Sequence, residues 1–509
     1  MSMSARNSRI IALLYAPLCA LLCALLCVSS GCAVGPNFRR PPPPPVTHYS
    51  NGTDPTETAS VQGTAQKFTP GAQVAADWWR LFQSAQLDAV MKEAVANNPG
   101  LHAAQASLRA SQNNLRSGYG IFYPSIDADA AATRERFTSA NFGENQPSSV
   151  FNLFTLSATV SYALDVFGGE RRLVEELRAE VDVAHANEQA AYLALTANIV
   201  NTVVASAAYR AEIEATAQLI ELQKEQVQIA NVQVQAGTAP YVNVLSLESQ
   251  LATTEAAIPQ LEQRLVQSDD LLAALVGHTP AEWGAPAVRL DDLALPGKLP
   301  VSLPSDLVRQ RPDILAAEAT AHAASANIGV ATAAMLPSIT LNGSLGAVTN
   351  STSRLFPSNG KEWSVGAGAT APLFEGGTLW FKRKAAIEDY RQSMDLYRQT
   401  VLAAFEQVAD VLRGLDHDAA ILLADDKALS TAAEALHLVQ VNYDSGIATY
   451  LDLLIADIQY RQAKIADLQA IALRYQDTVA LFAALGGGWW STPSAAAGAA
   501  APAVTPKVN

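Results

Sequence analysis

Few side chains in this sequence are spaced for chemistry. The seven histidines include no His-Glu-x-x-His pair and have no cysteine partner, so no zinc site is predicted. Asp416, His417 and Asp418 carry metal-binding groups, but residues i and i+2 of a helix do not share a face. The sequence contains neither a phosphate-binding Gly-rich loop followed by Lys-Ser/Thr nor a Gly-x-Ser-x-Gly elbow. We therefore expect no catalytic residues, no metal, no cofactor and no enzymatic activity.

One cysteine is placed for covalent modification. All four cysteines lie in the first 32 residues, and Cys32 follows an apolar run from Ile10 to Val28 that is preceded by Arg6 and Arg9. A positive start, an apolar middle and small residues before the cut are typical of a bacterial export signal. The Gly31-Cys32 pair at its end resembles a lipoprotein signal, which implies a cleaved signal peptide (1–31) and acyl chains on Cys32.

The residue that follows Cys32 bears on localisation. Ala33 rather than Asp at this position indicates sorting to the outer membrane of a Gram-negative cell. The alternative is an uncleaved single membrane span, because 19 apolar residues are just long enough to cross a bilayer.

Composition excludes two broad classes. With 34 Lys and Arg against 48 Asp and Glu, the net charge is −14, which argues against a nucleic-acid partner. A mean hydropathy of +0.10 is too low for a bundle of transmembrane helices. At 509 residues the chain exceeds what one hydrophobic core organises, so several units or an elongated shape are expected.

The sequence contains one unit twice. Asn98-Pro99-Gly100-Leu101 recurs as Arg311-Pro312-Asp313-Ile314, and Tyr123-Pro124-Ser125-Ile126 recurs at the same spacing as Leu336-Pro337-Ser338-Ile339. Each copy has a short helix, two strands, a helix of about 67 residues without proline, and a closing helix. At 1.5 Å per residue the long helices would reach ~100 Å, and helices of that length need partners along their whole length.

The predicted organisation follows from these repeats. It comprises a signal peptide (1–31), an extended segment (32–76), a first repeat (77–285), a linker (286–303), a second repeat (304–487) and a flexible tail (488–509). In the first repeat the predicted elements are strands 124–137 and 151–167 and helices 170–236 and 241–276. In the second they are helix 312–334, strands 337–348 and 362–374, and helices 378–445 and 449–485. The fold class is mainly α with a small β part.

The strands alternate between apolar and polar residues. Leu156, Ala158 and Val160 are separated by Ser157 and Thr159, and the second copy has the same pattern. This period suits a strand of a transmembrane barrel or of a soluble sandwich. The export signal favours the barrel. Four strands cannot close a barrel and open edges are not tolerated in lipid, so closure would require several chains; three would give twelve strands.

Together these features resemble the outer membrane factor family, the TolC-like and NodT-type channels of tripartite efflux systems. The resemblance covers essentially all of residues 32–487. The matching segments are Gly31–Pro36, Asp77–Phe82, Gln86–Asp88, Asn97–Pro99, Gln310–Ile314, Leu336–Ile339, Phe374–Gly377 and the hairpins at Gly237 and Gly446. The resemblance implies a homotrimer that forms a 12-stranded β-barrel in outer membrane lipid and a long α-helical barrel in the periplasm. It also implies two partners, a periplasmic adaptor protein and an inner-membrane RND transporter.

The resemblance assigns roles to the two helix-to-helix turns. Gly237, Tyr241, Gly446 and Tyr450 would contact the adaptor. On the first hairpin, Tyr241 and Glu248 are further candidates for the gate. A periplasmic gate would include the following residues: Tyr443, Leu451, Asp452, Ile455, Asp457 and Ile458. Family members often have Asp-Ala-Gln-Arg where this chain has Ile455–Ile458, so either a displaced ionic lock or an apolar constriction could close the gate. The same isoleucines could equally pack the coiled coil.

The predicted function is a passive outer-membrane duct that carries small toxic compounds from an RND-type pump to the exterior. One alternative is the channel of a type I, ABC-driven protein secretion system. The other is a lipid-tethered periplasmic coiled-coil scaffold without a pore.

Overall fold

The computed structural model describes residues 33–50, 54–61, 65–137, 148–355 and 360–491. Long helices predominate in this part of the chain and are accompanied by a smaller amount of β-structure, which confirms the predicted fold class. The predicted signal peptide (1–31), Cys32 and the tail beyond Ser491 lie outside the described residues.

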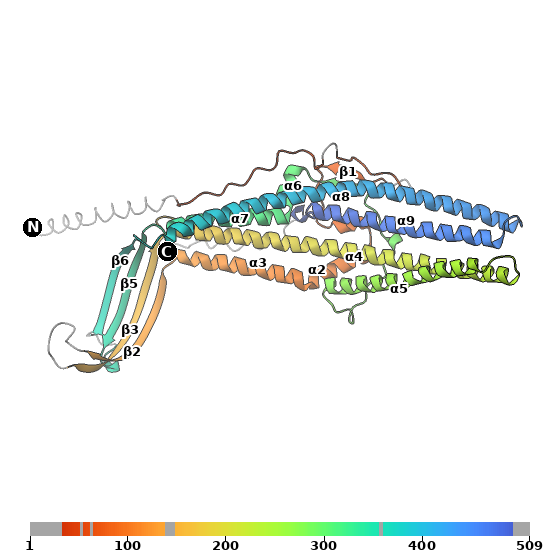
Figure 1. Ribbon diagram of the computed structural model, residues 1–509. Coiled ribbons are helices and arrows are strands. Elements are labelled where there is room, and N and C mark those ends of the chain that lie inside the picture. Colours follow the sequence, from red (N-terminus) through yellow and green to blue (C-terminus); the bar gives the residue numbers. More distant parts are fainter. Residues whose placement is uncertain (1–32, 51–53, 62–64, 138–147, 356–359, 492–509) are drawn as a thin grey trace, which may run out of the picture. The chain divides into compact units, whose positions relative to one another are not determined.

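The chain divides into two compact units, which do not coincide with the two sequence repeats (Figure 1). The first unit comprises Met1–Arg40, Leu108–Val183 and Ala317–Tyr397. The second comprises Pro41–Ser107, Ala184–Ala316 and Arg398–Asn509. Each unit therefore draws on both repeats, because corresponding segments of the two copies pack together.

The first unit contains a four-stranded antiparallel sheet in the order β2-β3-β5-β6 (Figure 1). Its strands are β2 (Ser125–Phe137), β3 (Ser149–Leu164), β5 (Ser338–Thr349) and β6 (Lys361–Thr370). The largest difference from the predicted strand bounds is the end of β6, at Thr370 rather than residue 374, ahead of Pro372, which has no N–H for the ladder. β3 also starts two residues earlier than predicted and ends at Leu164 rather than residue 167.

Strand register gives this sheet two chemically different faces. Residues two apart on a strand share a face, and paired residues on adjacent strands share it too. One face is largely apolar; across the four strands it carries Ile126, Ala128, Ala130, Tyr162, Val160, Ala158, Leu156, Leu341, Gly343, Leu345, Ala367, Val365 and Trp363. Toward the other end of the strands the same face carries Arg134, Arg136 and Lys361. The other face is largely polar; it carries Asp127, Asp129, Ser161, Thr159, Ser157, Asn342, Ser344, Gly346, Gly366, Ser364 and Glu362.

The helices repeat with matched lengths, which confirms the two-fold internal repeat. α4 (Gly169–Gln235) and α8 (Thr378–Asp444) have 67 residues each. α5 (Val242–Val276) and α9 (Tyr450–Ala484) have 35 each. One apolar window of α4 is long enough to cross a membrane, but 56% of that window is buried within the protein, as in a core helix.

Proline punctuation starts the shorter helices of both repeats. α3 (Pro99–Gly118) begins at Pro99, and the Asn98 Oδ1 accepts a hydrogen bond of 2.9 Å from the Leu101 N–H. α7 (Pro312–Ala333) also begins at a proline, but the residue before it is Arg311. Proline at the first helical position loses no hydrogen bond, and an Asn cap satisfies one of the free N–H groups.

The second unit has an aromatic core beside α9. Trp78, Phe82 and Phe482 are fully buried, and the Trp78 and Phe482 rings stack with centroids 5.0 Å apart. Two shorter helices, α2 (Ala85–Asn97) and α6 (Pro304–Gln310), belong to this unit.

Two segments of the second unit have local structure beyond the predicted organisation. β1 (Lys67–Pro70), in the segment predicted as extended, pairs in parallel with β4 (Lys298–Val301), in the segment predicted as a linker. At the start of the tail predicted as flexible from residue 488, Trp489–Ser491 form a short 3-10 helix, and the Trp489 and Trp490 indoles donate to the Gln310 carbonyl and the Gln73 side chain. Neither segment has a periodic pattern, and both are held by partners far away in the sequence.

Candidate functional site

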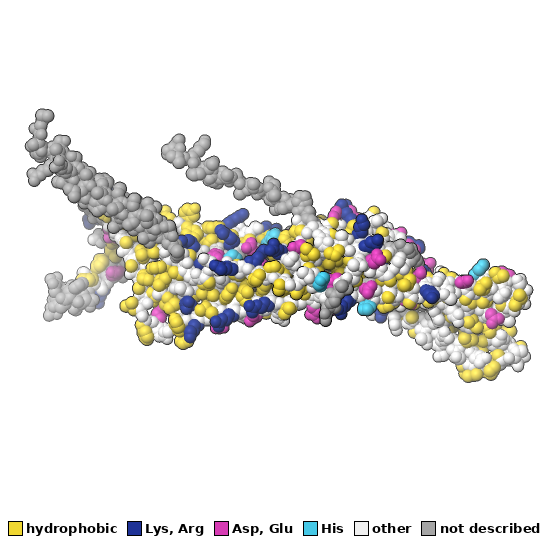
Figure 2. Space-filling model, turned by 90° about the horizontal axis from the view of Figure 1, so that it is seen from above, with side chains coloured by type: hydrophobic (Ala, Val, Ile, Leu, Met, Phe, Trp, Pro, Cys, Tyr) yellow, Lys and Arg dark blue, Asp and Glu magenta, His cyan; other side chains and the backbone are white. Residues whose placement is uncertain are grey.

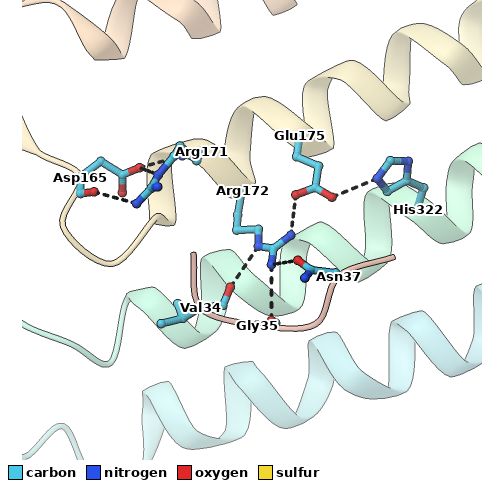
Figure 3. Close-up of polar contacts among 8 residues, drawn as sticks. All are labelled: Val34, Gly35, Asn37, Asp165, Arg171, Arg172, Glu175 and His322. Carbon is cyan, nitrogen blue, oxygen red and sulfur yellow. Dashed lines mark hydrogen bonds and ion pairs between the residues drawn. The ribbon is translucent and has the colours of Figure 1, made fainter. Parts of the chain in front are cut away.

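In the first unit, the chain that follows Cys32 lies against α4 and α7 (Figure 3). The Arg172 guanidinium of α4 donates to the Val34 carbonyl (3.0 Å), the Gly35 carbonyl (3.4 Å) and the Asn37 Oδ1 (2.7 Å). It also pairs with Glu175 at 2.6 Å. The Arg172 side chain is only 4% exposed, so its charge depends on these oxygens in place of water.

Glu175 connects this contact to α7. Its second oxygen lies 3.0 Å from the His322 Nε2 (Figure 3). The His322 ring also stacks on Phe38, with 4.6 Å between centroids. Burial alone would raise the pKa of Glu175, but the hydrogen bonds from Arg172 and His322 outweigh it, so the pKa lies below its usual value. Glu175 is therefore a carboxylate that fixes Arg172 and His322 on either side.

The turn from β3 into α4 completes this region. Asp165 accepts the N–H groups of Glu170 and Arg171 at 3.1 and 3.0 Å, and the Arg171 Nε donates to it at 3.0 Å (Figure 3). A carboxylate that caps a helix N-terminus satisfies free N–H groups and complements the helix dipole. This cap is also why β3 ends at Leu164.

The second unit contains both predicted helix-to-helix turns. Gly237 and Gly446 each end a long helix with a positive φ (+73° and +71°), a conformation that favours glycine. The following N–H groups donate back in the same pattern, Thr238 to the Gln233 carbonyl and Ile447 to the Asn442 carbonyl. The two turns are thus one structure formed twice.

The turns and their flanks are exposed. Tyr241 and Ile447 are 57% and 78% exposed, which leaves apolar side chains in contact with solvent at the helix ends. Tyr450 is exposed as well, but its hydroxyl donates to the Glu225 Oε2 of α4 at 2.6 Å. That hydrogen bond raises the pKa of Tyr450 and ties α9 to α4 near the turns.

A second polar connection lies about three turns further along α9. Arg461 donates to Asp457 at 3.1 Å and to the Gln218 Oε1 of α4 at 2.6 Å. The sequence expectation placed Asp457 in the gate without an arginine at the usual place. Arg461 stands four residues after Asp457, a helical spacing at which opposite charges meet, and that spacing could have revealed it. Glu225 and Gln218 gave no signal in sequence.

The other predicted gate residues have different surroundings: one caps a helix, one is buried, and the others are partly or largely exposed. Asp452 caps α9, because it accepts hydrogen bonds from the Thr449 hydroxyl and N–H, which lower its pKa. Ile458 is buried, whereas Ile455 is 40% exposed and Leu451 is intermediate. Tyr443 packs its ring against Tyr450, with centroids 5.7 Å apart.

Comparison with known proteins identifies the family. The family model described as "Outer membrane efflux protein" matches residues 90–278 and 303–487, the two halves of the repeat. The chain belongs to the outer membrane efflux protein family. This confirms the resemblance inferred from the sequence and the outer-membrane location.

Relatives of this outer membrane efflux protein cover nearly its whole length. Nodulation protein T of Rhizobium leguminosarum bv. viciae is 28% identical over 475 residues, 90% of this chain and 91% of that protein. The probable outer membrane lipoprotein SilC of Salmonella typhimurium is 26% identical, over 91% of this chain and 97% of that protein. The solved open state of the Neisseria gonorrhoeae MtrE outer membrane channel has a TM-score of 0.77 at 25% identity, over 90% and 99% of the two chains.

Proposed function

We propose that three copies of this chain form a passive outer-membrane duct. The observation that carries this proposal is the two-faced sheet with two open edges. In the described chain, β2 and β6 each pair with one neighbour only. On the apolar face, Val365 and Trp363 are 81% and 75% exposed. Closing three such sheets edge to edge would give twelve strands, with the apolar face toward lipid and the polar face toward a water-filled lumen.

Exposed apolar helix surface supports association with further copies. Figure 2 shows one face of the molecule on which hydrophobic side chains cover wide areas between rows of Lys and Arg. Among the helical residues, Phe381 and Leu402 are 65% and 72% exposed. Apolar surface of this kind is typical of protein interfaces.

The duct would belong to a tripartite efflux pump of the RND type. Its partners would be a periplasmic adaptor protein, which meets the turns at Gly237 and Gly446, and an inner-membrane transporter that supplies the energy. The relatives support this assignment, since proteins named as efflux pump outer membrane proteins are among them. The hydrogen bond from Tyr450 to Glu225 and the Arg461 contacts would hold the periplasmic gate closed. Small toxic compounds would pass through passively.

Cys32 would carry the acyl chains that anchor the protein in the outer membrane. The relative SilC is named as a probable outer membrane lipoprotein, and Cys32 follows an export signal in this sequence. Labelling cells with radioactive palmitate tests this point, with Cys32→Ser as the variant expected to lose the label.

Planar bilayers test the duct itself. The purified protein should behave as a trimer in detergent and should give ion-conducting steps when it is inserted in a planar bilayer. Variants that disrupt the proposed gate contacts should conduct more. A monomer without conductance, even after these changes, would leave the periplasmic scaffold as the better interpretation. Identification of the neighbouring genes would separate RND efflux from ABC-driven protein secretion.

A further inference from the structure

Three glycines allow the segment after Cys32 to lie directly on the protein backbone. A Cβ on Gly35, whose φ is +91°, would come within 2.5 Å of the Gly329 Cα of α7. A Cβ on Gly329 would meet the Arg172 Cγ at 2.6 Å and the Val34 carbonyl oxygen at 2.9 Å. A Cβ on Gly168, in the turn between β3 and α4, would lie 2.5 Å from the Ala33 Cα. No larger residue fits at these contacts without displacing backbone or a buried side chain.

Polar contacts fix the register of the same segment. The Val34 N–H donates to the Phe167 carbonyl at 3.0 Å, and its carbonyl accepts from Arg172. Because Arg172 also binds the Gly35 carbonyl and the Asn37 side chain, it contacts three successive parts of the segment. Sliding by one residue would remove the glycine that the close approach to Gly329 requires and would displace Asn37 from the guanidinium.

The far end of the segment is held by side chains. Phe38 stacks on His322, and the Arg40 Nε donates to Glu318 of α7 at 2.6 Å. The segment is therefore in contact from Ala33 to Arg40, and its first residue lies against the turn at which β3 ends.

We propose that α4, α7 and the β3–α4 turn form a docking groove for the chain's own residues 33–38, and that Arg172 is the residue that positions the lipid anchor through it. This inference rests on the proposed acylation of Cys32. With Ala33 held against Gly168, the acylated residue enters the membrane next to the end of β3 rather than on a loose tether. If the segment were free, each undocked residue would add up to about 3.5 Å of reach to the anchor.

A spin label beside the groove tests the docking. Arg39 is exposed and makes no contact that the groove needs, so Arg39→Cys with a nitroxide reports on the segment in the full lipidated protein in vesicles. The thiol of Cys32 carries the acyl group and does not react. In the otherwise unchanged protein the label should be immobilised. Arg172→Ala, which removes the guanidinium, should give a predominantly mobile spectrum.

Two further variants separate docking from general damage. Gly329→Ala keeps Arg172 but places a methyl group in the groove, and it should mobilise the label as well. Arg172→Lys keeps the charge but cannot span three acceptors, so it should be intermediate. The matched control is Arg178→Ala, an exposed arginine of the same helix whose hydrogen bond goes to the Tyr119 hydroxyl rather than to residues 33–38. Its spectrum should remain immobilised.

Proteolysis gives a second readout without a label. Trypsin should cleave after Arg39 at least tenfold faster in Arg172→Ala than in the unchanged protein or Arg178→Ala; the bond after Arg40 is resistant because Pro41 follows it. An immobile label together with unchanged cleavage in both Arg172→Ala and Gly329→Ala would overturn the docking proposal. Conductance and palmitate labelling of the unchanged protein are measured in the same preparations. Absence of conductance and of palmitate labelling would contradict the proposed function. Normal conductance, with a spin label that stays immobile in Arg172→Ala and Gly329→Ala, would contradict the docking groove alone.

Discussion

At the residue scale, the Tyr450 hydroxyl offers a direct test of the proposed gate. Its hydrogen bond to Glu225 links α9 to α4 at 2.6 Å. Removing one such bond from an exposed site costs about 1 kcal/mol, which corresponds to about a fivefold change in an equilibrium. We expect Tyr450→Phe to raise the open probability in planar bilayers by about that factor.

Tyr443→Phe is the matched control for this change. The Tyr443 ring packs on Tyr450, but among the described residues its hydroxyl has no hydrogen-bond partner. Its conductance should equal that of the unchanged protein. Equal conductance in both variants would show that the Tyr450 contact does not restrain the gate.

A second prediction concerns a pair of acidic side chains between α8 and α9. Asp477 lies against Gly414, where a Cβ would come within 2.8 Å of its Oδ2. Burial and then the facing Asp418 carboxyl raise the pKa of Asp477 from 3.8 to about 7. The Asp418 Oδ2 is buried and, in the described chain, without a donor, so the two groups need a proton between them.

The direction of the pH effect follows from the raised pKa. Between pH 3.8 and about 7 the folded chain retains a proton that the unfolded chain releases, so this pair makes folding less favourable as the pH rises. Asp477→Asn removes that penalty. At pH 8 it should raise the free energy of unfolding by an amount on the order of 1 kcal/mol and raise the melting temperature accordingly. The gain should fall away by pH 5. Asp416→Asn, an exposed neighbour, should show no such pH dependence in the same thermal melts by circular dichroism.

Individual contacts were the least predictable part of the molecule. The turns at Gly237 and Gly446 could be located from sequence because their motifs are local. Arg172 and His322 could not, since they act on residues 34–38 from about 135 and 285 positions away. Similarly, Asp418 was considered as a metal ligand beside Asp416, whereas its actual neighbour is Asp477 on another helix.

At the scale of the elements, the two faces of the sheet can be distinguished by paired substitutions. Val160 lies on the apolar face and Thr159 on the polar face of the same strand. A lysine on the lipid side near the midplane costs about 2–4 kcal/mol per chain, whereas one facing water costs little. We expect Val160→Lys to abolish the heat-resistant oligomer on gels and Thr159→Lys to preserve it. Loss of the oligomer in Thr159→Lys but not in Val160→Lys would show that the lipid-facing and water-facing sides of the sheet are assigned incorrectly.

Elements with a strong period were predictable and those without one were not. The long helices differ from the predicted bounds by at most one residue at each end, because 67 residues without proline leave few other solutions. β1 and β4 have four residues each and pair across about 230 positions of sequence. Strands this short have too little apolar–polar alternation, and no hairpin turn between them, to be predicted from sequence. Their pairing depends on tertiary context.

At the scale of the whole molecule, disulfide cross-linking tests closure of the proposed barrel. Ala130 on β2 shares the apolar face with Val365 and Ala367 on β6, whereas Gly366 points to the opposite face. A protein carrying Ala130→Cys with Val365→Cys or Ala367→Cys should cross-link between chains and give species of one, two and three chains. The Gly366→Cys pair should not. A ladder that continues beyond three chains would indicate open polymers and would contradict a closed trimer.

The interleaving of the two repeats has a consequence for biogenesis. Since β3 pairs with β5, and both compact units include segments from each half of the sequence, neither half can complete a unit before the other has been made. Separately expressed halves should thus remain unfolded until mixed. We therefore expect the nascent chain to stay unfolded in the cytoplasm, and thus competent for export, until its last helix has been synthesised.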